Sequence, residues 1–168
     1  MKWKKTDITQ YTEAKEYIDT VLIPLMPFEM ESDTHLDVNA FQYEWTMLLV
    51  NELEKELTGR MMLLPPYVYR KPIIQEQELT RIDSWAKEIK KQPFNHVFFL
   101  TLDGGWKKHE EALPGTLLWL PGMKSGDLHS ADMYRFIRDQ VEQMSEYHRL
   151  FDGMLTFYYI QLLARKLQ

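Results

Sequence analysis

The feature that most constrains the fold is an apolar, β-rich run at residues 96–102, His-Val-Phe-Phe-Leu-Thr-Leu, which ends at the turn Asp103-Gly-Gly-Trp106. Strands that are buried on both faces have this near-continuous apolar pattern, and they occur in parallel sheets covered by helices. Ligands of such sheets bind beyond the carboxyl ends of the strands. We therefore expect an α/β fold with this strand inside the sheet and a site close to the turn.

The rest of the pattern predicts a single α/β domain with a small, mostly parallel four-stranded sheet flanked by helices. Further apolar runs predict strands at 21–26, 60–64 and 116–120, and helical spacing predicts helices near 7–18, 39–57 and 78–91. Asp7 and Asn39 are the expected N-caps of the first two helices. Pro24 cannot donate a ladder hydrogen bond, so the first strand is expected at an edge or with a bulge. The short link before the last strand leaves an antiparallel hairpin open as an alternative.

The chain divides into a sheet core, residues 1–125, and a C-terminal helical segment, residues 126–168. Apolar residues of this segment recur at alternating steps of three and four, which predicts one long helix that Gly153 can bend or split. Its later half is apolar on several faces and must pack either on the core or on a partner chain. In the second case the helix makes a homodimer, with an interface at Phe151, Leu155, Tyr158 and Leu162.

Composition excludes several classes of function. The chain has 168 residues, a formal net charge of −5 and no cysteine. The negative charge argues against nucleic-acid binding, and the absence of cysteine removes disulfides and thiolate metal sites. The longest apolar runs are far shorter than the roughly 20 residues of a membrane span, and no secretory signal is visible. We therefore expect a cytoplasmic protein without a membrane or nucleic-acid partner.

The strongest candidate for chemistry is the acidic segment 28–37. Glu29, Glu31 and His35 follow the first predicted strand with no lysine or arginine among them. Carboxylate and imidazole groups are ligands for a divalent metal, and Asp103 and His109 beyond the central strand could complete such a site. A solvated acidic loop without a cofactor is the simpler interpretation, because no compact ligand pattern such as H-x-x-x-H is present.

A second group of residues extends this candidate pocket. The segment 67–72, Tyr-Val-Tyr-Arg-Lys-Pro, is expected to be a connection that either receives an anionic or planar ligand or is anchored by its tyrosines. The turn at Asp103 lacks the spacing of a dinucleotide-binding loop, and neither a G-x-S-x-G elbow nor a P-loop occurs. The predicted pocket residues are Glu29, Glu31, His35, Tyr67, Asp103 and Trp106.

Several segments together carry a family resemblance. They are Met1-Lys-Trp, Ala14-Lys-Glu-Tyr-Ile-Asp19, Ile23-Pro-Leu25, Leu63-Leu-Pro-Pro66, residues 92–101 and Trp106-Lys107. In these segments, which span most of residues 1–121, the chain resembles the YpiF-like family of short, uncharacterised proteins from Bacillus-type bacteria. The resemblance implies no activity.

A fainter likeness is to creatininase-type amidohydrolases, which are metal-dependent α/β enzymes. Glu29 stands where that family has a metal-binding glutamate, but Glu31 and Asp103 stand where it has histidines. The Pro-Gly-Thr segment 114–116 follows the turn here, whereas it precedes the turn in the family. The likeness therefore implies a creatininase-like scaffold without the metal ligands.

Two functional hypotheses follow. The preferred one is a non-catalytic interaction module that binds a protein or a small ligand. The alternative is a divergent metal-dependent hydrolase with Glu29, Glu31, His35 and Asp103 as an altered ligand set.

Overall fold

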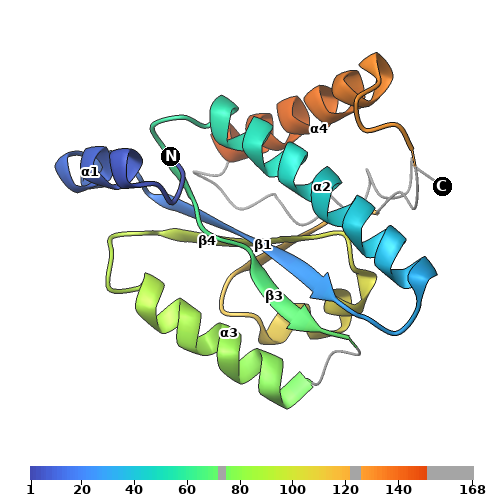
Figure 1. Ribbon diagram of the computed structural model, residues 1–168. Coiled ribbons are helices and arrows are strands. Elements are labelled where there is room, and N and C mark those ends of the chain that lie inside the picture. The colour runs from blue at the N-terminus through green and yellow to red at the C-terminus, as the bar shows by residue number, and fades with distance from the viewer. Residues whose placement is uncertain (72–74, 122–125, 151–168) are drawn as a thin grey trace.

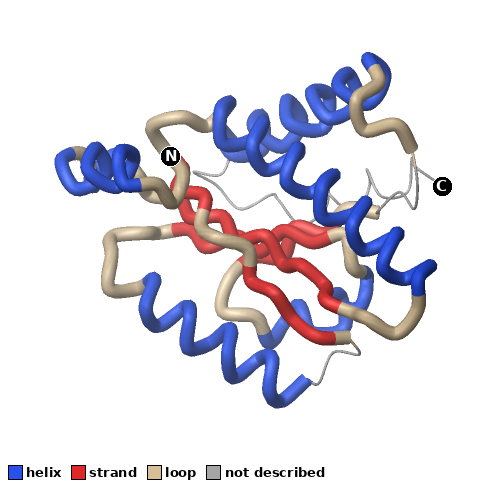
Figure 2. The backbone as a smooth tube through the Cα atoms, viewed as in Figure 1, coloured by secondary structure: helices blue, strands red, loops and turns tan. Residues whose placement is uncertain are grey.

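A parallel sheet of five strands lies between two layers of helices in the computed structural model, which describes residues 1–71, 75–121 and 126–150, with 75 and 143–150 as backbone only (Figures 1 and 2). The strands are β1 (Thr20–Phe28), β2 (Met61–Leu63), β3 (Tyr67–Arg70), β4 (His96–Thr101) and β5 (Thr116–Trp119). Their order is β2-β1-β4-β5, with β3 also paired to β1. Every recorded pairing is parallel, so the carboxyl ends of the strands meet at one edge.

The helices divide between the two faces of the sheet (Figure 1). They are α1 (Lys5–Glu13), α2 (Asp33–Glu56), α3 (Gln75–Ile89) and α4 (Ala131–Leu150), with short 3₁₀ helices η1 (Lys15–Tyr17) and η2 (Gly104–Ala112). Helices α2 and α4 form a core with one face, and α1, α3 and η2 form a second core with the other. This arrangement confirms the predicted α/β class with a parallel sheet flanked by helices.

Strand β4 lies between β1 and β5, as its sequence predicts. Phe98 and Leu100 pack in the core beneath α2 and α4, whereas Phe99 packs in the core on the α3 side. Because successive side chains of a strand point to opposite faces, a strand covered on both faces needs apolar residues at every position. Each fully buried side chain of this size contributes about 1.5–3 kcal/mol relative to an exposed one.

Strand β1 is central, so the edge position expected from Pro24 is wrong. Strand β4 pairs along one side of β1, while β2 and β3 follow one another along the other side. Leu64 donates its N–H to the carbonyl of Leu22, which therefore faces the β2–β3 side. Pro24, two residues on, faces the same side, at the place where the link through Pro65 separates the two short strands. The N–H that proline lacks would therefore point to the break between β2 and β3, so the sheet loses no hydrogen bond there.

Strand β3 is the fifth strand, at a place where the sequence predicts a connection. Its side chains alternate between buried and exposed, with Tyr67 and Tyr69 in the core and Val68 and Arg70 at the surface. A strand this short has too few alternations to be distinguished from a loop that is anchored by two tyrosines.

Both predicted N-caps are wrong, and the second changes the candidate site. Ser32 caps α2 by accepting the N–H of His35 at 3.3 Å, seven residues before the predicted cap Asn39. Half of the acidic segment, residues 33–37, is therefore the start of a helix, residues 29–32 remain a loop, and Phe28 ends β1. Helix α1 begins at Lys5, and Asp7 lies in its first turn, where it accepts the N–H of Lys2 at 2.7 Å.

The connection between β4 and β5 is a parallel crossover through η2, which rules out the hairpin alternative. Gly115 lets the returning chain approach β4 closely. A Cβ atom at this glycine would lie 2.5 Å from the carbonyl oxygen of Val97, a distance that real contacts do not reach.

Helix α4 packs on α2 through Met133, Ile137 and Val141, so this part of the C-terminal segment belongs to the core. The predicted interface residues Phe151, Leu155, Tyr158 and Leu162, together with Gly153, lie outside the described residues. None of the helices in the described part is long and apolar enough to cross a membrane.

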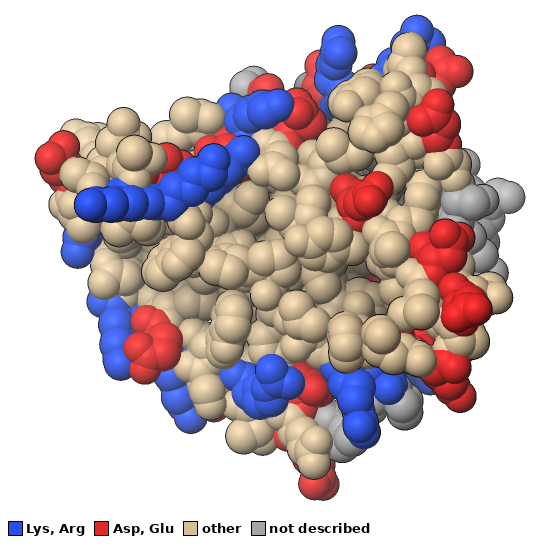
Figure 3. Space-filling view, viewed as in Figure 1, with Lys and Arg blue, Asp and Glu red and all other residues tan. Residues whose placement is uncertain are grey.

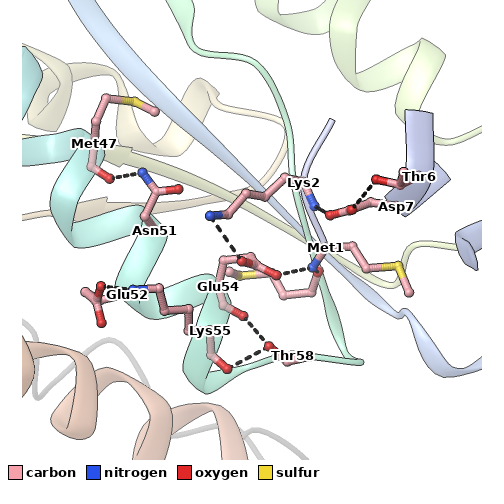
Figure 4. Close-up of polar contacts among 11 residues, drawn as sticks. Met1, Lys2, Thr6, Asp7, Met47, Asn51, Glu52, Glu54, Lys55 and Thr58 are labelled. Atoms are coloured by element: carbon pink, nitrogen blue, oxygen red, sulfur yellow. Dashed lines mark hydrogen bonds and ion pairs between the residues drawn. The ribbon is translucent and has the colours of Figure 1, made fainter. Parts of the chain in front are cut away.

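The amino-terminal residues tie the free edge of β2 to α2 (Figure 4). The Met1 ammonium donates to the carboxylate of Glu54 at 2.5 Å and to the carbonyl of Met61 at 2.7 Å. The ammonium of Lys2 lies 3.7 Å from the second oxygen of Glu54. The Glu54 side chain is only 10% exposed, and these two cations compensate for the water that its carboxylate loses on burial.

We expect Glu54→Gln to lower the free energy of unfolding by about 1.5 kcal/mol, because an amide keeps one acceptor but loses the charge-assisted bonds. Urea unfolding followed by circular dichroism measures the change. Glu52→Gln is the matched control, because the Glu52 side chain also pairs with a lysine, Lys55, but is 40% exposed. We expect this control to lower the free energy of unfolding by less than about 0.5 kcal/mol. Equal losses in the two variants would contradict an anchoring role of Glu54.

Candidate functional site

The carboxyl edge of the sheet carries two separate groups of polar side chains. One follows β1 and comprises Glu29, Glu31 and His35. The other follows β3 and β4 and centres on Asp103, with Tyr69 and Lys71.

Glu29, Glu31 and His35 offer ligand atoms that all lie within 4.8 Å of one another. The Ser32 cap produces this geometry, because it places His35 in the first turn of α2 beside the two glutamates of the loop. His35 Nδ1 lies 3.1 Å from Glu29 Oε1. The His35 side chain is 51% exposed and that of Glu29 17%, so the group opens to solvent. Two carboxylates and an imidazole can hold a divalent cation while leaving positions open to water.

Asp103 is not in this group, because its carboxylate is used inside the fold. Oδ2 accepts the hydroxyl of Tyr69 at 2.6 Å and lies 3.3 Å from the Lys71 ammonium. Oδ1 accepts the N–H of Gly105 at 2.9 Å, which closes the turn into η2. Thr101 supports the turn from below, since its hydroxyl accepts the N–H of Asp103 at 3.1 Å.

The ionisation of this group follows from its contacts. Burial alone would raise the pKa of Asp103, but the bonds from Tyr69 and Gly105 and the Lys71 charge outweigh burial and hold the pKa below its ordinary value of 3.8. Burial, followed by the negative charge of Asp103, raises the pKa of the Tyr69 hydroxyl. The pair is therefore a carboxylate that accepts from a neutral phenol, with its proton fixed on the tyrosine.

The remaining predicted pocket residues point elsewhere. Tyr67 donates to the carboxylate of Glu78 on α3 and lies under the guanidinium of Arg81, 5.0 Å from the ring centre. Trp106 is fully buried and meets the Tyr69 ring edge-to-face at 5.1 Å. His109 lies on η2 beside Trp106 and away from the glutamates of the metal-ligand group. The predicted residues thus do not line one common pocket.

A groove that the sequence did not indicate lies on the α3 side, near the amino-terminal residues. A hollow of about 490 Å³ is lined by Trp3, Leu64, Pro65, Trp85, Ile89 and Phe94, with Glu88, Lys91 and Gln92 at its rim. A second hollow of about 400 Å³ lies between Trp3 and α1 and is bordered by Lys4 and Lys5. We call these two adjoining hollows the Trp3 groove, because Trp3 lines both and is 62% exposed.

The face of the molecule that carries this groove is largely uncharged at its centre and charged toward its borders. Figure 3 shows lysine and arginine side chains along the α1 side of this face and carboxylates along the side where α2 begins. The groove joins three segments that are far apart in sequence, so no local pattern reveals it. The exposed Trp3 in a lysine-rich stretch is the one signal that the sequence offers.

Residues 9–150 match a sequence family described as protein of unknown function (DUF2487). The chain belongs to the DUF2487 family. This family member is similar to the uncharacterized protein YpiF of Bacillus subtilis (strain 168), with 39% identity over 116 residues, which cover 67% of this chain and 72% of that protein. The similarity confirms the YpiF-like resemblance. No solved structure matches the chain.

Neither description names an activity, so the function of this DUF2487 protein has to be inferred from its geometry. The likeness to creatininase-type enzymes stays a prediction. Two features remain as candidates: the group of Glu29, Glu31 and His35, and the Trp3 groove.

Proposed function

We propose that this protein is a non-catalytic binding module that holds an apolar segment of a partner protein in the Trp3 groove. The observation that carries the proposal is the groove itself: an apolar hollow of about 490 Å³ with a tryptophan exposed at its border. Tryptophan and other aromatic side chains in such hollows dominate the affinity of protein interfaces. A small apolar ligand is the other class that such a groove can accept.

The walls of the groove are held in place before any ligand arrives. Phe94 stacks on Tyr11 of α1 with ring centres 5.6 Å apart. Trp85 packs edge-to-face on Tyr67 at 5.3 Å. At the rim, the side chain of Gln92 accepts from the Tyr11 hydroxyl at 3.1 Å. A preformed surface binds without the cost of ordering its side chains, which favours a recognition role.

The polar groups at the strand ends favour a structural role over catalysis. A general base or nucleophile needs an atom that is free to meet a substrate. The oxygens of Asp103 are committed to Tyr69, Gly105 and Lys71. The hydroxyl of Tyr67 is likewise committed to Glu78.

Panning of a random peptide library on the full chain tests the proposal. We expect enrichment of peptides with large apolar residues, and we expect Trp3→Ala to weaken their binding by at least tenfold, because an anchor of this kind contributes about 1–2 kcal/mol or more. Tyr17→Ala is the matched control, since Tyr17 is 67% exposed and does not line the groove. No enrichment, or equal binding by the two variants, would reject the proposed function.

A divergent metal-dependent hydrolase is the second candidate, and the grouping of Glu29, Glu31 and His35 favours it. Three such ligands with solvent access resemble a catalytic metal site, which keeps a position open for water or substrate. The fourth predicted ligand, Asp103, points into the fold toward Tyr69, so the ligand set would have to be completed by water.

For this candidate we expect Zn²⁺ or Mn²⁺ to raise the melting temperature of the wild-type chain but not that of Glu29→Gln/His35→Ala. Binding to the folded state stabilises it in proportion to the logarithm of metal concentration over Kd. Elemental analysis of purified protein gives an independent count of bound metal. Equal metal-induced shifts of the melting temperature in the two proteins would reject this candidate.

The proposal includes a cytoplasmic location, which agrees with a chain that has no cysteine. It also includes self-association through the C-terminal residues Phe151, Leu155, Tyr158 and Leu162. Light scattering on the full chain and on a version truncated after Arg149 measures this: a full-length monomer at high concentration would refute the dimer.

A further inference from the structure

We propose further that the partner segment combines an apolar anchor with neighbouring carboxylates, so that the anchor enters the larger hollow and the carboxylates meet Lys4 and Lys5. This inference rests on the proposed function and assigns the chemistry of the partner. It is carried by the charged residues around Trp3, which lines both an apolar hollow and a second hollow that is also lined by Lys4 and Lys5.

Most lysines near the groove already have partners. Lys91 pairs with Glu88 at 2.6 Å, Lys15 donates to Gln92 at 3.2 Å, and Lys2 lies beside Glu54. These side chains therefore add little net attraction for a ligand.

Lys4 and Lys5 differ from these lysines. Within the described ranges, neither ammonium lies within ion-pair distance of a carboxylate. The nearest acidic group in the sequence, Asp7, turns its oxygens to the N–H of Lys2 and the hydroxyl of Thr6, and the Lys4 charge also helps to lower the pKa of Asp7. Asp7 therefore offsets part of the charge of the two lysines, and a net positive charge remains at the end of the groove that α1 borders.

The location of these charges favours an acidic peptide over a basic or neutral one. Lys5 is the first residue of α1, and the amino end of a helix adds a partial positive charge to the same place. A segment that lays an apolar side chain against Trp3 and continues toward α1 brings its next residues beside Lys4 and Lys5. Carboxylates there gain attraction, whereas lysine or arginine would be repelled.

The test compares peptides recovered from the library on three forms of the full chain: wild type, Lys4→Glu/Lys5→Glu, and Lys55→Glu/Arg138→Glu. The last form changes the net charge by the same amount at surface positions on α2 and α4, away from the groove. We expect aspartate and glutamate next to the apolar residues in peptides selected by the wild type and by the control. We expect these peptides to bind the Lys4/Lys5 variant about tenfold more weakly, with a difference that shrinks as salt rises.

The outcomes separate the two levels of the proposal. Apolar peptides that show no acidic preference, or that bind all three forms equally, would overturn the acidic partner and leave the groove intact. Selection of basic peptides by the wild type would overturn it as well. Failure to recover any groove-dependent peptide would overturn the proposed function together with this inference.

Discussion

Trp106→Ala is expected to lower the free energy of unfolding by about 3–5 kcal/mol, because it removes a large, fully buried side chain. Trp106 is fully buried and meets the Tyr69 ring edge-to-face, with ring centres 5.1 Å apart and an interplanar angle of 89°. Its removal leaves a cavity in the core between η2 and β3 that the rigid sheet cannot fill. Since domains of this size have total stabilities of about 5–15 kcal/mol, the variant loses a large share of the total.

Urea unfolding gives the size of this loss, and Trp3→Ala is the matched control. The control removes the same side chain from a position that is 62% exposed, so its expected cost is below about 0.5 kcal/mol. A Trp106→Ala protein as stable as the control would mean that Trp106 faces a ligand pocket and not the core.

Asp103→Asn is expected to cost about 2–3 kcal/mol at neutral pH, because Asp103 accepts bonds from the buried Tyr69 hydroxyl and from the N–H of Gly105 and pairs with Lys71. The asparagine amide is neutral and cannot carry the negative charge that these donors stabilise. Its NH₂ group would also be turned toward the donor groups of Tyr69 or Gly105.

The pH dependence of this loss follows from the pKa of Asp103, which the fold holds below 3.8. A lowered native pKa contributes stability above the unfolded-state pKa, and that stability is lost as pH falls through the native pKa. The difference between wild type and Asp103→Asn should therefore be constant from neutral pH to about pH 5 and shrink below about pH 4. Asp83→Asn, which removes a 50% exposed partner of Lys87, is expected to change little at any pH. A difference that persists unchanged at pH 3 would show that the Asp103 charge does not stabilise the fold.

The sheet core was predictable because its signals are local. Residues 96–102 are apolar except for His96 and Thr101, which indicates burial on both faces, and the apolar residues of α2 and α3 recur at helical spacing. Parallel pairing then follows from alternating strands and helices, and it brings the strand ends to one edge. The edge was therefore the right place to expect polar side chains such as Asp103.

What the sequence could not predict depends on contacts between distant segments. Pro24 lies in a central strand only because the pairing along one side of that strand is interrupted at Pro65, 41 residues away in the chain. The Tyr69–Asp103 bond joins β3 to the end of β4, and it turns a candidate ligand into a structural group. The Trp3 groove needs α1, the β2–β3 link and the end of α3 at once.

Hydrogen exchange of the full chain, with and without an acidic apolar peptide recovered from the library, tests the central claim most directly. We expect the peptide to slow exchange in residues 3–9 and 85–94, which border the Trp3 groove, and to leave residues 29–37 unchanged. Protection confined to residues 29–37, beside Glu29 and His35, would contradict the account and move the binding site to the carboxyl edge of the sheet.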